Sequence, residues 1–130
     1  MKLYLRNNGT KENWIDIDYQ GETFKLLIDY PTPEQEQIIQ TLTYGIDYAG
    51  YDSIIKLSQY IIKFVVKDWN GITDDKGNEI KIKIVNNEME KEQWWAFVKD
   101  PKFSIFLFEK IKDKISFDII DKKKFSLPQL

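Results

Sequence analysis

Apolar residues occupy every second position in segments 15–19 and 24–28. A period of two is typical of a β-strand with one covered face and one face in water. The segment 20–22, Gln-Gly-Glu, lies between the two runs and contains a turn-forming glycine. The pattern therefore predicts an antiparallel β-hairpin, and residues 2–5 are a candidate for a further strand.

The chain after the hairpin carries the signals of a helix start. Thr32 can cap a helix, Pro33 suits the first helical position, and Gln35 has capping-box spacing to Thr32. The apolar face of this helix is marked by Ile38, Ile39 and Leu42. Gly45 is the predicted end, because glycine readily adopts the conformation that terminates helices.

A longer apolar pattern begins after Asp52, which is placed to cap a second helix. One stripe at helical spacing consists of Ile54, Leu57, Ile61, Phe64 and Val65. A second stripe beside it consists of Ile55, Ile62, Val66 and Trp69. Two adjoining stripes predict a helix packed on two neighbours, with a strand over the β-branched run 61–66 as the alternative.

Turns, a short extended segment and two further helices are predicted in the rest of the chain. Glycines and asparagines in segment 68–79 mark two turns, and isoleucines alternate with lysines over 80–84. Asn87 and Glu90 have capping-box spacing, which predicts a helix through residue 98. Pro101 interrupts that helix, since proline disfavours helical backbone in the preceding residue. A last helix should begin near residue 102.

The order of these elements predicts the fold class. Strands come first and helices follow, which indicates an α+β fold: an N-terminal antiparallel β-hairpin or small sheet followed by a mainly helical bundle. No repeat or Gly/Ser linker divides the chain, so residues 1–120 are expected to form a single domain. Residues 117–120 are a possible last strand, and residues 121–130 are a Lys-rich C-terminal tail.

The composition narrows the possible chemistry. The 130 residues include no cysteine and no histidine, which excludes disulfides, thiolate metal sites and His-based acid–base catalysis. The chain also lacks a phosphate-binding or nucleophile-elbow motif. We therefore expect no enzymatic activity and no cofactor.

Net charge and hydropathy bear on partners and location. A net charge of −2 argues against a general nucleic-acid binder, which usually has a clear basic excess. No apolar stretch is long enough to cross a membrane, and no signal-peptide pattern follows Met1. The expectation is a cytoplasmic protein that associates with neither nucleic acid nor membrane.

Two groups of acidic residues are candidates for chemistry. Asp16 and Asp18 lie on one face of the first predicted strand, where alternating polar residues are also expected without any function. Segment 68–78 is rich in Asp, Asn and Gly, but Lys76 stands where a calcium loop needs an oxygen ligand. Turn chemistry is the preferred interpretation of this loop.

Aromatic side chains are the strongest candidates for a functional surface. Trp94 and Trp95 are adjacent, so on a helix they point about 100° apart. Phe103, Phe106 and Phe108 also face different sides of the next helix. These five residues are the predicted partner-binding residues, because aromatic anchors are favoured in protein interfaces. A well-covered core and stacking on single-stranded nucleic acid are the alternatives.

Segment 65–80, VVKDWNGITDDKGNEI, carries a resemblance to a known family. An apolar helix end, an Asp-Trp-x-Gly run, an Asp-x-x-Gly-Asn turn and a following helix pair resemble tail assembly chaperones of siphophages that infect low-GC Gram-positive bacteria. Segments 30–34 and 94–101 fit the same pattern, and the resemblance extends over residues 14–112.

This resemblance implies a phage or prophage protein in the cytoplasm of a bacterial host. Such a chaperone binds the tape-measure protein through helical surfaces, keeps it soluble and helps to recruit tail-tube subunits. It has no cofactor and no catalytic residues. A small virion structural protein of the tail or head–tail connector, which could be a homo-oligomer, is one alternative. A cytosolic protein-binding regulator is another.

Overall fold

The computed structural model describes residues 13–115, apart from the side chains of residues 45–49 and 51. The strands are β1 (Asn13–Tyr19), β2 (Glu22–Ile28), β3 (Val66–Asn70), β4 (Ile84–Val85) and β5 (Glu88–Met89). The helices are α1 (Pro33–Ala49), α2 (Tyr51–Val65), α3 (Lys91–Val98) and α4 (Pro101–Lys112). The predicted α+β class is confirmed, whereas the possible strands at 2–5 and 117–120 and the tail 121–130 lie outside the described residues.

The predicted N-terminal hairpin is present. β1 and β2 pair in antiparallel register, with Tyr19 opposite Glu22 and Ile17 opposite Phe24. Gln20 and Gly21 both have positive φ, as the tight two-residue turn of a hairpin requires. Ile15 and Ile17 are buried while Asp16 and Asp18 are exposed, so the period-two pattern placed the covered face correctly.

A third strand was not predicted. α2 ends at Val65, and the chain passes directly into β3, which pairs antiparallel with β2. Trp69, assigned from the sequence to a helical stripe, lies in this strand opposite Leu26, so that assignment is wrong. The β-branched residues around Val65 are compatible with a helix or a strand. The chain continues as a strand because the free edge of β2 offers hydrogen-bond partners to its backbone.

The start of α1 was predicted correctly and its end was not. The Thr32 N–H donates to Gln35 Oε1 (2.9 Å), and the Gln35 N–H donates to Thr32 Oγ1 (3.2 Å), which completes the capping box. The helix continues through Gly45, where we expected it to stop. Gly50, with φ of 66°, takes the positive-φ position instead, between α1 and α2.

The predicted caps of α2 and α3 are both wrong. Gly50, not Asp52, is the N-cap of α2, and Asp52 lies in the first turn. Asn87 adopts positive φ in the β4–β5 turn, which asparagine tolerates better than most residues. Glu90 caps α3, because its carboxylate accepts the N–H groups of residues 92 and 93. These two hydrogen bonds lower the pKa of Glu90.

The break between α3 and α4 lies where the sequence placed it. Pro101 is the first residue of α4, and Asp100 caps the helix by accepting the Lys102 N–H (3.0 Å). The Ser104 hydroxyl donates to the Val98 carbonyl (2.6 Å), so the two short helices are tied at their junction. This junction determines the directions in which the aromatic side chains of α3 and α4 point.

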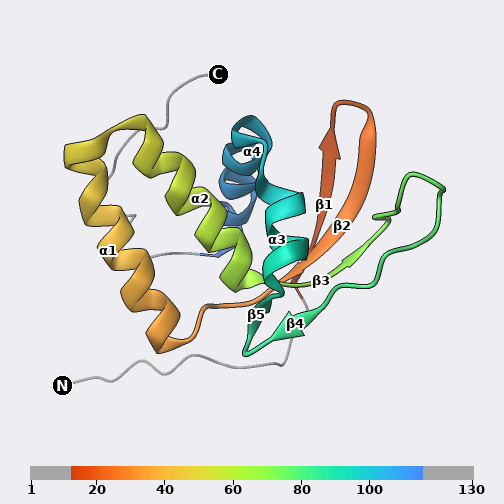
Figure 1. The fold of residues 1–130 in the computed structure, drawn as a ribbon, viewed down its shortest axis with the longest axis horizontal. Helices are drawn as coiled ribbons and strands as arrows, with labels where there is room; N and C mark the ends of the chain where they lie inside the picture. The colour runs from red at the N-terminus through yellow and green to blue at the C-terminus, as the bar shows by residue number, and fades with distance from the viewer. Residues whose placement is uncertain (1–12, 116–130) are drawn as a thin grey trace.

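α2 lies at the centre of the molecule. Figure 1 shows α1 on one side of it, α3 and α4 on the other, and the β1–β2 hairpin beyond them. Leu57, Ile61, Ile62 and Val65 of α2 are fully buried, as two neighbouring apolar stripes require. These residues belong to one core cluster with the inner face of the sheet and with Phe108 of α4.

Candidate functional site

The five aromatic residues predicted to bind a partner differ in burial. Phe108 is 0% exposed and Trp94 is also buried, so both belong to the core. Phe103 and Phe106 are half-buried and pack against that core. Trp95 is 52% exposed. The structure therefore removes Trp94 and Phe108 from the predicted partner-binding surface and leaves Trp95 as its most accessible member.

Helix geometry and one hydrogen bond explain why the adjacent tryptophans differ. The Trp94 indole N–H donates to the Gln59 carbonyl of α2 (2.8 Å), which holds this ring between the helices. The Lys63 ammonium lies 4.6 Å from the centre of the Trp94 ring. Because successive helical residues point about 100° apart, Trp95 is directed away from α2.

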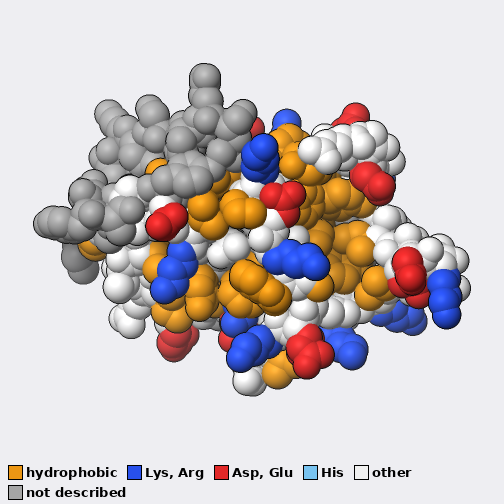
Figure 2. Space-filling model, turned by 45° about the horizontal axis from the view of Figure 1, so that its top comes forward, with side chains coloured by type: hydrophobic (Ala, Val, Ile, Leu, Met, Phe, Trp, Pro, Cys, Tyr) orange, Lys and Arg blue, Asp and Glu red, His pale blue; other side chains and the backbone are white. Residues whose placement is uncertain are grey.

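Phe103 and Phe106 belong to an aromatic cluster that joins the hairpin to the helices. Its members are Tyr19, Phe24, Phe97, Phe103 and Phe106, all half-buried. The Tyr19 ring centre lies 5.1 Å from that of Phe103 and 4.8 Å from that of Phe106. Figure 2 shows hydrophobic side chains across the middle of one face, with charged side chains between them and at its margins. The cluster mainly packs the hairpin onto α3 and α4.

A groove of about 430 Å³ lies between α1, α2 and the β4–β5 turn. Ile38, Tyr60 and Phe64 give it apolar walls, and Ile38 is 44% exposed. The sequence placed Ile38 on the buried face of α1, but only its neighbour Ile39 is buried. Adjacent residues on a helix cannot both face one narrow buried seam. The neighbouring residues Ile38 and Ile39 were therefore the signal in the sequence that one of the two is exposed.

Ring contacts connect this groove to Trp95. The Tyr60 ring centre lies 5.2 Å from that of Trp94, and the two tryptophan ring centres lie 6.1 Å apart. We call the exposed Ile38 and Trp95, with the half-buried Tyr60 and Lys63, the α1–α3 surface. Lys63 lies 3.4 Å from Glu88 in an ion pair, and both residues line the groove.

Two side chains fix the turn that closes the groove. The Asn87 carbonyl accepts the Gln35 side-chain amide (3.0 Å) and the Lys67 ammonium (2.6 Å). Gln35 therefore caps α1 with its oxygen and holds the β4–β5 turn with its nitrogen. The groove is thus preformed by hydrogen bonds between segments far apart in the sequence.

The burial of Lys67 can be tested through the pH dependence of the free energy of unfolding. Burial lowers the pKa of Lys67 from its ordinary 10.5, although Asp29 and Glu88 act in the opposite direction. Below pH 10.5 the unfolded chain then binds more protons than the folded chain, so the free energy of unfolding rises with pH in this alkaline window. We expect wild type to gain stability relative to Lys67→Met as pH approaches this value. Urea denaturation of both proteins over a pH series measures this difference in stability. Stability profiles that stay parallel as the pH rises would contradict the prediction.

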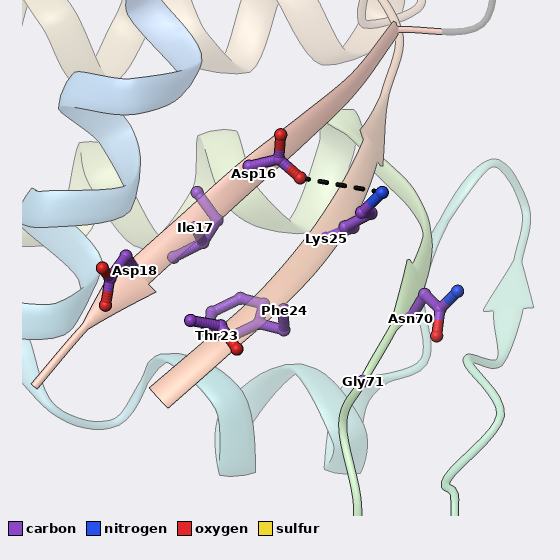
Figure 3. Close-up of a pocket in the computed structure, with 8 residues that line it drawn as sticks. All are labelled: Asp16, Ile17, Asp18, Thr23, Phe24, Lys25, Asn70 and Gly71. Atoms are coloured by element: carbon purple, nitrogen blue, oxygen red, sulfur yellow. Dashed lines mark ion pairs between the residues drawn. The ribbon is translucent and has the colours of Figure 1, made fainter. Parts of the chain in front are cut away.

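The predicted carboxylate pair lies on the outer face of the hairpin, beside a shallow groove of about 440 Å³ (Figure 3). Asp16 forms an ion pair with Lys25 of β2 (3.8 Å), and both side chains are mostly exposed. Asp18 and Asn70 line the same groove. Among the side chains that the structure describes, no three acidic groups are placed together in a way that could hold a metal. The arrangement is typical of the solvated face of a sheet.

The acidic loop after β3 forms turns, as preferred from the sequence. Asp74 Oδ1 accepts the N–H groups of Lys76 and Asn78, each at 2.9 Å. The Asn78 N–H contributes most to lowering the pKa of Asp74. The Asp74 carboxylate therefore stabilises the turn of its own loop. Gly71, with φ of 91°, allows β3 to end close to the backbone of Phe24.

Comparison with protein-family models, with curated proteins and with solved structures found no match. None of the helices in the described part of the chain is long and apolar enough to cross a membrane.

Proposed function

We propose that this protein is an assembly factor that binds another polypeptide through the α1–α3 surface. The observation that carries the proposal is the half-exposed Trp95, whose ring packs on Trp94 and, through it, on Tyr60 in the wall of a preformed groove. Tryptophan is among the residues that contribute most to binding energy in protein interfaces. A helix with an apolar stripe is a suitable occupant, because such helices bind in apolar grooves through residues three or four positions apart.

The specific role proposed is that of a phage tail assembly chaperone in the cytoplasm of its bacterial host. Its partner is the tape-measure protein, a long helical chain whose apolar stripe is exposed before assembly. The support is the resemblance in segment 65–80 together with a surface suited to such a stripe. The net charge of −2 favours solubility of a complex that covers apolar surface.

Co-expression with the tape-measure protein encoded in the same gene cluster tests this role. Wild type should raise the soluble amount of the tape-measure protein and be recovered with it in a stable complex. Unchanged solubility and no complex would refute it. Mass spectrometry of purified virions distinguishes the structural-protein alternative, because a chaperone is absent from mature particles. A single stoichiometric partner from uninfected host lysate would instead favour the regulator.

Replacing Trp95 with alanine should separate binding from stability. The exposed indole contributes little to folding, so we expect a change in unfolding free energy within about 0.5 kcal/mol. Loss of an aromatic anchor should weaken partner binding by about 2 kcal/mol or more. Thermal melting and titration of the purified partner measure the two quantities. Exposed Lys102→Ala, on α4, is the matched control, and binding lost equally in both variants would contradict the role of Trp95.

A further inference from the structure

The outer side of α4 and the end of the β1–β2 hairpin share a row of side chains. The Lys110 ammonium lies 5.5 Å from the centre of the Phe106 ring, and that centre lies 4.8 Å from the centre of the Tyr19 ring. Tyr19 is directly opposite Glu22 in the hairpin, and opposite residues of an antiparallel pair point to the same face of the sheet. The row therefore consists of a cation, two rings and a carboxylate, in that order.

Both charged ends of this row are available to a partner. Glu22 and Lys110 are exposed, and the rings of Tyr19 and Phe106 between them are half-buried members of the aromatic cluster. None of the ion pairs in the described part of the chain involves Glu22 or Lys110. The row thus presents two unpaired charges of opposite sign on either side of two partly exposed rings.

The row is complementary to itself after a half-turn. A two-fold axis between the two rings reverses the order of the side chains in the second copy, so a carboxylate faces each ammonium and a phenol ring faces each phenyl ring. We infer that two copies of this chain pair through the row, with Glu22 of one copy against Lys110 of the partner subunit. The same contact occurs twice, as in every two-fold interface.

The charges select this arrangement over the reverse one. Two rows running in the same direction would place Lys110 against a second ammonium and Glu22 against a second carboxylate, and like charges brought together across an interface cost several kcal/mol. In the two-fold arrangement Phe106 meets Tyr19 of the partner subunit, and tilted or offset contacts between aromatic rings are favourable. The rings also shield the neighbouring ion pairs from water, which strengthens them.

The strength of the association follows from the size of the row. The row is short, and its rings also pack within their own copy, so the dimer is a weak and reversible one. Dissolved salt should weaken it further, because exposed charges are screened. Trp95 packs on Trp94, outside the row, so a dimer keeps the α1–α3 surface free for another partner.

Charge reversal at the two ends of the row tests this dimer in the full-length protein. Wild type should show a concentration-dependent equilibrium between monomer and dimer by analytical ultracentrifugation at low ionic strength. Glu22→Lys and Lys110→Glu each place like charges at both ends of the interface. Each should therefore raise the dissociation constant of the dimer by about tenfold or more.

Mixing the two variants is the decisive step. Every contact across an interface between Glu22→Lys and Lys110→Glu again joins opposite charges, so an equimolar mixture should associate as wild type does. Native mass spectrometry with one variant isotope-labelled should then show dimers that contain one copy of each. Phe106→Ala should weaken association in wild type, because it removes one ring from each half of the interface.

Control variants keep the test specific. Lys56→Glu on α2 and Glu79→Lys before β4 make the same charge changes at exposed positions outside the row, and both should associate as wild type does. Trp95→Ala should also leave association unchanged, which separates this inference from the proposed partner binding. Circular dichroism should be the same for wild type and for all charge variants, since the substituted side chains are exposed.

Four outcomes would overturn the inference. Wild type could remain monomeric at every soluble concentration, or a reversed variant could associate as strongly as wild type. The mixture of reversed variants could remain monomeric. Loss of association in Trp95→Ala would place the contact between copies on the α1–α3 surface instead.

Discussion

Replacing Trp69 with alanine is expected to lower the free energy of unfolding by about 3–5 kcal/mol. The side chain is buried at the junction of β3 with the helices, and its ring centre lies 5.3 Å from that of Phe97. Its indole N–H donates to the Ile80 carbonyl (2.7 Å). The substitution therefore creates a cavity and leaves a carbonyl without its donor at the same time.

Equilibrium denaturation of wild type and variants by urea measures this loss. Trp69→Phe is the matched control, because it keeps a ring in the core while removing the hydrogen bond to Ile80. It should cost clearly less than the alanine variant. An alanine variant as stable as wild type would show that Trp69 is exposed, contrary to the described structure.

Replacing Phe108 with alanine is the second change with a large expected effect, also about 3–5 kcal/mol. Phe108 is fully buried in the core between α4 and α2, so the cavity has no access to solvent. Phe106→Ala, two residues earlier, is the matched control, because that ring is half-buried and should cost less. Urea denaturation again gives both values. Equal losses for the two variants would contradict the assigned orientation of α4.

This comparison also bears on function. A weaker partner interaction in Phe108→Ala would follow from partial unfolding and not from a lost contact. The Trp95→Ala variant has the opposite profile, with stability kept and binding lost. The two variants together distinguish a core role from a surface role among residues that look equivalent in the sequence.

Elements specified by neighbouring residues were predicted well. The hairpin of β1 and β2 follows from alternation around Gly21, and the start of α1 follows from the reciprocal hydrogen bonds of Thr32 and Gln35. The boundary at Pro101 is equally local. In each case the energetic preference is satisfied within a few residues, so no distant contact is needed to settle it.

Elements that depend on distant contacts were missed. β3 exists because β2 offers it an edge, and Trp69 is in the core because the strand turns it inward. Gly45 and Gly50 are both acceptable helix ends, and Asn87 could cap a helix as well as form a turn. In these cases the local propensities for the competing conformations are nearly equal. Contacts between distant segments then determine which conformation forms.

The sequence by itself determined the α+β class, the N-terminal hairpin and the first helix cap, because these depend on neighbouring residues. Its lack of histidine and cysteine also excluded chemistry that depends on those side chains. Only the tertiary structure decided that Phe108 is enclosed while Trp95 is exposed, and that Ile38 faces a groove. Burial is a relation between segments, so its energy arises only when the chain has folded.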